Sequence, residues 1–252
     1  MSRSGRWTGF VVAVSVGLTL AGGAVGLAGP GSTATAAEPP NLGRAKAAVK
    51  EYYGGHVVDG RNQHSEDSQW GRDTGAKVRE AREALLDRVE PAAGRAIVLD
   101  VDDTAEITYG WAADRDFGFD RGAQHEAIRA GVFPPIRPVR ELAWDAHRLG
   151  IKVFFITGRP ESLREPTARH LAEKGFPPAE LFLKPDRAED APPYLPCADK
   201  CRTGVYKTLT REHLQEARGH TIVVNVGDQE SDFEGGFSRH DIKLPNPMYH
   251  VR

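Results

Sequence analysis

The feature that most constrains this chain is an apolar run that ends abruptly in acidic residues, Ala96–Thr104, with the sequence AIVLDVDDT. A run without polar alternation is typical of a strand buried on both faces, as in a parallel sheet. Side chains alternate along a strand, so Asp100 and Asp102 leave on the same side, about 6 to 7 Å apart along the chain. Like charges at the end of a buried strand are costly unless a cation or a substrate uses them. The stretch therefore predicts a functional site.

The rest of the chain alternates between strand-like runs and helical stripes. Strands are predicted at residues 96–99, 151–156, 181–183, 221–226 and 242–244, and helices at about 41–53, 72–89, 136–149, 165–174 and 206–218. Residues 54–68 are rich in Gly, His, Asn and Gln and are predicted to form a loop. Strands separated by helices imply an α/β fold with a mostly parallel sheet and helices on both faces. Pro245 and Pro247 after the last strand favour an edge position for it.

Residues 105–134 follow the acidic cluster and are too long for a simple connection. They contain aromatic residues among charges and glycines, namely Tyr109, Trp111, Phe117, Phe119 and Phe133. Long segments beside a site often act as lids. Two interpretations stay open: an insertion that covers the substrate, or a surface excursion whose aromatic side chains pack against the body.

The first residues have the pattern of a secretory signal peptide. Arg3 and Arg6 precede an apolar stretch, Phe10–Leu20, and Ala34-Thr35-Ala36 supplies the small residues that a signal peptidase reads. We expect a signal peptide over residues 1–36, cleavage near Ala36–Ala37, and one domain over residues 37–252. The protein is therefore expected to be secreted into the extracellular space.

A retained, N-terminally membrane-anchored and extracytoplasmic form is the alternative, since the apolar stretch approaches spanning length. Five glycines between Gly17 and Gly29, followed by Pro30, disfavour a stable span and favour cleavage. After cleavage no membrane span is expected.

Charge and cysteine content narrow the function classes. The formal net charge is −2, and removal of the 1–36 segment with its two arginines leaves 31 basic and 35 acidic residues, a charge of −4. There is no basic excess of the kind that nucleic-acid binding needs, so no nucleic-acid polymer is expected as partner. Cys197 and Cys201 are the two cysteines. An exported protein can form a disulfide, and a local bridge is favoured over a zinc site, because two thiols are half of one.

Polar residues follow three of the predicted strands. The acidic cluster follows the first strand, Thr157-Gly158-Arg159 the second and Gly227-Asp228 the fourth. Each taken alone has an ordinary structural explanation as a turn or a cap. Ligands of parallel sheets bind outside the carboxyl ends of the strands, so the coincidence predicts one site at that edge.

These residue types suit phosphate-ester chemistry. Mg²⁺ prefers one or two carboxylates plus substrate phosphate and water. A carboxylate can attack phosphorus, a neighbouring one can move a proton, and a hydroxyl and an ammonium can hold the phosphoryl oxygens. The sequence lacks the zinc-protease, nucleophile-elbow and Walker A motifs that would favour other chemistries.

The motifs resemble those of the haloacid dehalogenase (HAD) superfamily. Asp100-x-Asp102-x-Thr104 resembles its first motif, Thr157 in FITGRPE its second, Tyr206-Lys207 its lysine motif, and Gly227-Asp228-x-x-x-Asp232 its fourth. The runs DVDDT, NVGDQ (225–229) and KLPNPMY (243–249) are similar to those of the subfamily IIIB acid phosphatases, which include bacterial class B-type enzymes and plant vegetative storage-type proteins. The resemblance covers about residues 40–250. It implies a HAD-like, Rossmannoid three-layer α/β/α sandwich with a small cap insertion after the first strand, at 105–134.

The resemblance also implies roles for individual residues. They are a nucleophile and Mg²⁺ ligand at Asp100, a general acid/base that gives its backbone carbonyl to the metal at Asp102, phosphoryl-binding groups at Thr157, Gly158 and Lys207, a third protein ligand at Asp228, and supporting residues at Thr104 and Asp232, the latter orienting a metal-bound water or the lysine. Lys184 is an alternative to Lys207, since it also follows a strand. Asp103 is read as a surface carboxylate or one that supports the ligands. Arg159 is read either as a substrate contact or as a salt-bridge partner.

Taken together, the chain is expected to be a secreted, Mg²⁺-dependent acid phosphatase that hydrolyses small phosphomonoesters through a phospho-aspartate on Asp100. Two alternatives stay open: a phosphotransferase that uses the same intermediate, and a non-catalytic storage or binding protein on the same fold. The sequence does not identify the phosphomonoester or the oligomeric state.

Overall fold

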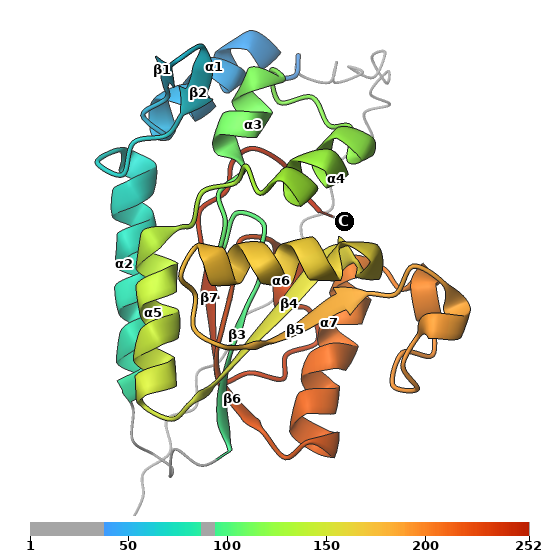
Figure 1. Cartoon of the computed structure of the whole chain (residues 1–252). Coiled ribbons are helices and arrows are strands. Elements are labelled where there is room, and N and C mark those ends of the chain that lie inside the picture. The colour runs from blue at the N-terminus through green and yellow to red at the C-terminus, as the bar shows by residue number, and fades with distance from the viewer. Residues whose placement is uncertain (1–37, 87–93, 252) are drawn as a thin grey trace, which may run out of the picture. The chain divides into compact units, whose positions relative to one another are not determined.

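A five-stranded parallel sheet lies at the centre of the computed structural model, which describes residues 38–86 and 94–251 (Figure 1). Its strands are β3 (Arg95–Leu99), β4 (Lys152–Pro160), β5 (Glu180–Lys184), β6 (Thr221–Gly227) and β7 (His240–Lys243), in the order β5-β4-β3-β6-β7. All four pairings are parallel. The five predicted strands are confirmed, and the last one lies at an edge as expected. The predicted signal peptide and its cleavage site lie outside the described residues.

Strand order places the acidic run at the middle of the sheet. From β3 the chain adds β4 and β5 on one side, then returns to add β6 and β7 on the other. The change of direction lies between β3 and β6, the kind of position where open α/β sheets bind ligands. Asp100 follows β3 there, and its backbone N–H donates to the Val226 carbonyl of β6 at 3.0 Å.

Helices cover both faces of the sheet. The helices are α1 (Leu42–Tyr52), α2 (Gln69–Leu86), α3 (Tyr109–Asp114), α4 (Arg121–Ala130), α5 (Arg137–Arg148), α6 (Arg164–Glu173) and α7 (Thr203–Glu212), with a π-helical turn at His213–Ala217. The predicted helices agree with five of these within a few residues. No helix among the described residues is both long and apolar enough to cross a membrane.

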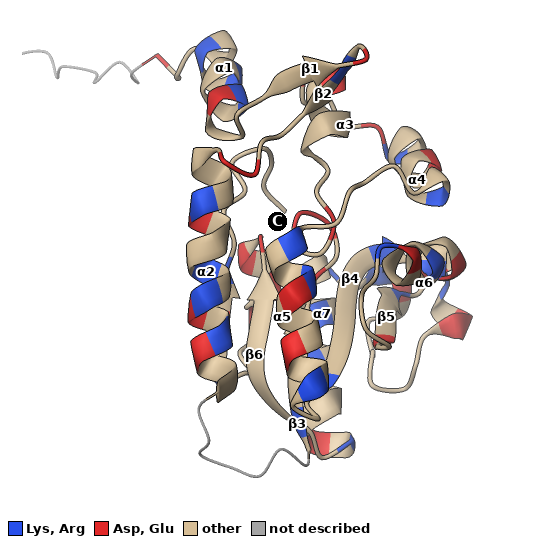
Figure 2. Ribbon diagram, turned by 60° about the vertical axis from the view of Figure 1, so that its left-hand side comes forward, with Lys and Arg blue, Asp and Glu red and all other residues tan. Residues whose placement is uncertain are grey.

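The alternation of side chains along β3 separates two core layers. Ile97 and Leu99 lie in the cluster that contains the buried faces of α2 and α5, while Ala96 and Val98 lie in the cluster of α7 and the π-helical turn. Lys, Arg, Asp and Glu occupy the outward faces of α2 and α5 (Figure 2). Each fully buried aliphatic side chain stabilises this arrangement by about 1.5–3 kcal/mol. The result is the three-layer α/β/α sandwich that was expected.

Residues 54–68 are not the continuous loop that was predicted. They contain an antiparallel hairpin, β1 (His56–Val58) and β2 (Arg61–Gln63). Its two turn residues, Asp59 and Gly60, both have positive φ, of 50° and 75°, which is the requirement of a type I′ turn. The strands are exposed and lack apolar alternation, so the Asp-Gly pair was the one available signal for the hairpin.

The 105–134 segment folds into α3 and α4 rather than into an irregular excursion. α3 packs against β2, and α4 packs against α6. The Tyr109 ring stacks on Tyr53 at a centroid distance of 4.4 Å, and Trp111 meets Phe133 edge-on. Phe119, by contrast, is 70 % exposed. Aromatic packing therefore accounts for part of the segment, and its use as a cap over the substrate stays a prediction.

Candidate active site

Asp100 and Lys207 form a buried ion pair at the end of β3. The Lys207 Nζ, from the second turn of α7, donates to Asp100 Oδ1 at 2.5 Å and also to Asp232 Oδ1. Burial alone would lower the pKa of Lys207, but Asp100 and Asp232 outweigh it and hold that pKa above its ordinary value. Lys207 is therefore a fixed positive charge beside the Asp100 carboxylate at any physiological pH.

Asp228 lies one residue beyond β6, across from Asp100, and is almost fully buried. Its Oδ2 accepts hydrogen bonds from Gln229 Nε2 and Asn246 Nδ2, each at 2.7 Å. Thr104 Oγ1 lies 3.4 Å from the other oxygen, Oδ1. Burial first, and then repulsion from Asp232 and Asp103, raises the pKa of Asp228 to about 7.

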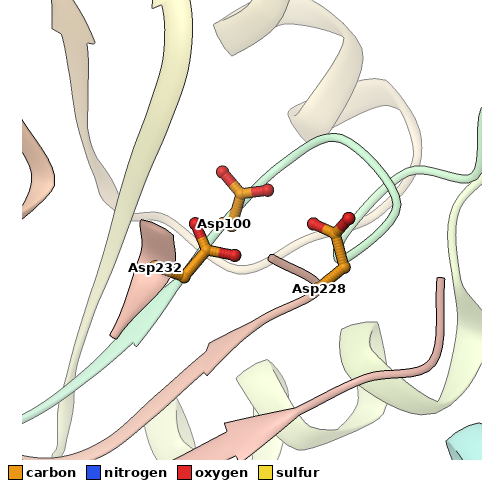
Figure 3. A group of neighbouring side chains, drawn as sticks. All are labelled: Asp100, Asp228 and Asp232. Atoms are coloured by element: carbon orange, nitrogen blue, oxygen red, sulfur yellow. The ribbon is translucent and has the colours of Figure 1, made fainter. Parts of the chain in front are cut away.

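Asp232 follows β6 by one short 3-10 turn, Glu230–Asp232, and faces Asp100 and Asp228 (Figure 3). Both of its carboxylate oxygens already have protein partners, since Oδ1 accepts from Lys207 and Oδ2 accepts from the backbone N–H of Gln229 at 2.8 Å. These contacts make Asp232 the residue that orients Lys207.

The donor set fits a hard divalent cation. Oxygen atoms of Asp100, Asp228 and Asp232 lie within 4.8 Å of one another, and all three residues are buried. Desolvation and mutual repulsion raise the pKa of Asp100 well above its usual range despite Lys207, and a cation bound by the carboxylates would relieve that repulsion. Asp232 is engaged by Lys207 and Gln229, so Asp100 and Asp228 are the carboxylates better placed to bind the ion directly.

Asp102 turns toward a different partner from the other acids. Its Oδ2 accepts from Arg159 Nε at 3.0 Å and its Oδ1 accepts from Arg159 Nη2 at 2.7 Å. Arg159 was expected to be either a substrate contact or a salt-bridge partner, and the structure contains the salt bridge. Asp102 retains 19 % of its side-chain exposure, whereas Arg159 retains 2 %, so the carboxylate faces solvent on one side only.

The remaining predicted residues lie around this centre. Thr157 is fully buried in β4, while Gly158 is exposed and a Cβ there would meet the Thr203 side chain at 3.4 Å. Thr104 is buried against Asp228. Lys184 is half-buried at the end of β5, where burial and then Arg121 lower its pKa. Lys207, and not Lys184, is therefore the lysine that the structure brings to Asp100.

Asp103 is buried rather than on the surface. It adopts a positive φ of 55° and accepts hydrogen bonds from the Thr108 N–H at 2.9 Å, Thr108 Oγ1 at 2.6 Å and the Tyr249 hydroxyl at 2.9 Å. Burial raises the pKa of Asp103 to about 7, although the hydrogen bonds from Thr108 act in the opposite direction. Its contacts hold the turn that carries Asp100 and Asp102.

The two cysteines of the loop before α7 form a disulfide, Cys197–Cys201, with Cα atoms 5.0 Å apart. Cys201 is buried in the core layer that contains α7, two residues before that helix begins. The bridge therefore stabilises the segment that leads into the helix of Lys207.

Sequence reasoning missed several residues that support the site. Asn246 and Tyr249 reach it from the C-terminal tail, and Glu106 reaches Arg159 from the 105–134 segment. The tail motif was noticed as a family resemblance, but nothing in it said which acid it contacts. Glu106 carried no signal, because its partners lie more than 50 residues away.

Comparison with known proteins agrees with this site. Residues 56–252 match the family described as HAD superfamily, subfamily IIIB (acid phosphatase). The chain belongs to this family. Similar proteins include Acid phosphatase 1 of Solanum lycopersicum, 30% identical over 158 residues, and Vegetative storage protein 1 of Arabidopsis thaliana, 30% identical over 159 residues. Each alignment covers 61% of this chain. The chain covers 58% and 54% of the length of these two relatives.

A solved structure shares the fold of this subfamily IIIB chain. The class C acid phosphatase of Bacillus anthracis superposes with a TM-score of 0.56 at 18% identity, over 83% of this chain and 86% of that one. The likeness establishes the HAD-like fold.

Proposed function

We propose that this chain is a secreted, Mg²⁺-dependent phosphomonoesterase that acts through a phospho-aspartate on Asp100. The observation that carries the proposal is the Lys207 ammonium 2.5 Å from Asp100 Oδ1, inside a group of buried acids at the end of the central strand. A carboxylate beside a fixed positive charge can attack phosphorus without repelling the anionic ester. Family membership supports this chemistry.

In the first half of the reaction, an oxygen of Asp100 forms a bond to phosphorus while the bond from phosphorus to the ester oxygen breaks. Asp102, in its acid form, gives its proton to the leaving oxygen, so an alcohol departs. Lys207 balances negative charge on the phosphoryl oxygens, and Thr157 and Gly158, in the last part of β4, are assigned to bind those oxygens.

In the second half, water attacks the phosphorus of phospho-Asp100. Asp102, now a carboxylate, takes a proton from that water, and the bond between phosphorus and Asp100 breaks. Inorganic phosphate leaves, Asp100 is again a carboxylate, and Asp102 is again protonated. The two acids therefore need different surroundings. Asp100 lies beside Lys207, and Asp102 lies beside Arg159 with part of its side chain exposed, which supports this division of roles.

Mg²⁺ would be held by the carboxylates of Asp100 and Asp228 together with the backbone carbonyl of Asp102. When bound, it would neutralise charge on the phosphoryl group and hold it against Asp100. Asp232 would not bind the ion but would hold Lys207 in position. The Asp228 carboxylate is held by its contacts with Thr104, Gln229 and Asn246.

A storage protein on the same fold is the second candidate, because two vegetative storage proteins are among the relatives. A storage role alone requires no assembled site. Here Asp100, Lys207 and Asp228 are all present and brought together by three different elements, which favours turnover.

Export is part of the proposal. The 1–36 pattern of basic start, apolar stretch and small residues supports it, and the Cys197–Cys201 disulfide suits an oxidising compartment. Recovery of the protein outside the cytoplasm with a new N-terminus near Ala37, measured by intact mass, is the expected result. A full-length chain still attached to the membrane would contradict cleavage.

The test is hydrolysis of p-nitrophenyl phosphate by the purified protein, with Mg²⁺ and with EDTA. We expect Mg²⁺-dependent release of p-nitrophenol, and a loss of at least about a thousandfold in Asp100→Asn, since removal of a nucleophile costs several orders of magnitude in rate. The exposed Asp67 provides a matched control, and Asp67→Asn should retain full activity. Full activity in Asp100→Asn would exclude the covalent route, and an inactive wild type would favour storage.

A further inference from the structure

A chain of buried charges runs from Asp102 away from the reacting centre. Arg159 Nη2, which binds Asp102, also donates to Glu106 Oε2 at 2.7 Å. Glu106 Oε1 in turn accepts from Lys174 Nζ at 2.5 Å. The exposed fractions of the Glu106 and Lys174 side chains are 2 % and 14 %. None of the motifs of the proposed mechanism includes Glu106 or Lys174.

Hydrogen bonds from three of its nitrogens hold the Arg159 guanidinium in place. Its Nε and Nη2 donate to the two carboxylate oxygens of Asp102. Nη2 also donates to Glu106, and Nη1 donates to Thr167 at 3.2 Å. Two parallel N–H···O bonds fix a carboxylate in direction as well as in distance. Burial alone would lower the pKa of Arg159, but Asp102 and Glu106 more than compensate and raise it. Because Nε, Nη1 and Nη2 all donate hydrogen bonds, the partners of Arg159 set the orientation of its guanidinium.

Glu106 is held in place by the backbone that folds back after β3. Its N–H donates to the Val101 carbonyl at 2.8 Å, and its carbonyl accepts from the Asp103 N–H at 2.6 Å. A lone buried carboxylate would be strongly destabilising. Arg159 from β4 and Lys174 from the end of α6 balance it, so three separate elements meet at one acid.

We propose that Glu106 and Lys174 are positioning residues that fix Arg159, and through it the carboxylate of Asp102, in the orientation for proton exchange with the leaving oxygen. The inference rests on the proposed function and adds two residues to it. Asp102 itself touches the substrate; Glu106 and Lys174 act through Arg159 and contact no reacting atom.

The inference predicts a dependence on the leaving group. Protonation of the leaving oxygen matters most when the departing alkoxide is a poor leaving group, and least for p-nitrophenolate. If Asp102 is misoriented, hydrolysis of an alkyl phosphate must fall much more than hydrolysis of p-nitrophenyl phosphate. General instability or loss of phosphate binding would reduce both rates alike.

The experiment compares kcat and KM for glycerol 2-phosphate and p-nitrophenyl phosphate in Glu106→Gln, Lys174→Met and the neutral double variant. We expect kcat/KM, which reports the steps up to release of the alcohol, to fall about tenfold or more for glycerol 2-phosphate and less than about threefold for p-nitrophenyl phosphate, because general acid–base catalysis is worth about 10²–10⁴ in rate. In an Asp102→Asn background, the same changes should not further alter the ratio of the glycerol 2-phosphate rate to the p-nitrophenyl phosphate rate.

Two controls keep the outcome decisive. Glu180→Gln neutralises a carboxylate that pairs with Arg218 at the opposite end of β5, and it should leave both substrates unaffected. The double variant carries no unpaired buried charge from Glu106 or Lys174, and its thermal unfolding shows that it is folded.

Equal falls in kcat/KM for the two substrates would overturn the positioning role. A wild type that hydrolyses neither ester would overturn the proposed function and this inference with it. A wild type that is active, with the variants unchanged on both substrates, would overturn the inference alone.

Discussion

Asp228 illustrates how single side chains prepare a carboxylate to bind a cation. Two amide groups, from Gln229 and Asn246, donate to its Oδ2. They hold Oδ2, while Oδ1 has Thr104 Oγ1 as its neighbour at 3.4 Å. Such supporting contacts typically change metal affinity by about 10–100-fold when they are removed.

Asn246→Ala should therefore weaken Mg²⁺ binding by about tenfold, because Asp228 keeps one amide donor and loses the other. The Mg²⁺ dissociation constant, measured by calorimetry, checks this without reference to turnover. Asn41→Ala is the matched control, since Asn41 caps α1 at an exposed position. An unchanged Mg²⁺ affinity in Asn246→Ala would contradict the role of this amide.

The residues of the site divide by how local their signals are. Asp100, Asp102 and Asp228 were identified because each lies within three residues of the end of a strand, a position that the sequence pattern reveals. The partners that orient them were not, because the contact of Asn246 with Asp228 and that of Glu106 with Lys174 depend on packing of distant elements. Lys207 was preferred over Lys184 from the family resemblance, and its contact with Asp100 depends on the packing of α7 against the sheet.

At the scale of elements, two glycines are expected to have opposite effects on stability, one inside a helix and one in a hairpin turn. Gly75 lies inside helix α2, where a Cβ would meet only the end of the Arg79 side chain at 3.6 Å. Gly60 lies in the β1–β2 turn with φ of +75°, a conformation that L side chains rarely adopt, although a Cβ there would meet no atom within 4 Å. Space is available at both positions, so backbone conformation decides the effect.

Gly75→Ala should raise the free energy of unfolding by about 0.5–1 kcal/mol, because alanine loses less conformational freedom in a helix. Gly60→Ala should lower it by about 1 kcal/mol, because the left-handed region is unfavourable for a residue with a Cβ. Urea denaturation of the two variants beside wild type measures both values. Shifts of the same sign would show that the backbone argument is wrong.

The elements themselves were largely predictable. Strands β3, β4, β5 and β6 each contain a short apolar run, and each long helix has an apolar stripe, so these patterns located them. The β1–β2 hairpin was missed because three-residue exposed strands such as His56–Val58 have no periodicity to detect. Helix α3 was missed because it has only six residues and its aromatic side chains, Tyr109 and Trp111, pack into two different clusters, so no single apolar stripe marks it.

At the scale of the whole molecule, the buried acids make stability depend on pH. The pKa of Asp103 and that of Asp228 are raised to about 7, against about 3.9 in an unfolded chain. In the metal-free protein the folded state therefore binds more protons than the unfolded state between about pH 4 and 7. Stability from these groups is complete below about pH 4 and is lost as pH rises through 7.

The melting temperature in EDTA should accordingly fall by several degrees between pH 6.5 and 8. The comparison starts at pH 6.5 because histidines such as His64, whose pKa burial lowers, act in the opposite direction below it. Mg²⁺ requires ionised carboxylates, so it should raise the melting temperature more at pH 8 than at pH 5. Thermal unfolding in EDTA at pH 6.5 and 8, and with Mg²⁺ at pH 5 and 8, checks these two expectations. A metal-free protein that becomes more stable toward pH 8 would contradict the first.

The C-terminal tail gives the molecule an order of assembly. Asn246 and Tyr249 bind acids that precede them by 18 and 146 residues. During synthesis, the strand that carries Asp100 leaves the ribosome long before the segment that completes its surroundings. A nascent chain that stops short of residue 246 contains the residues of all five strands and lacks the two tail contacts, so the site is completed only after residues 246–249 have been synthesised.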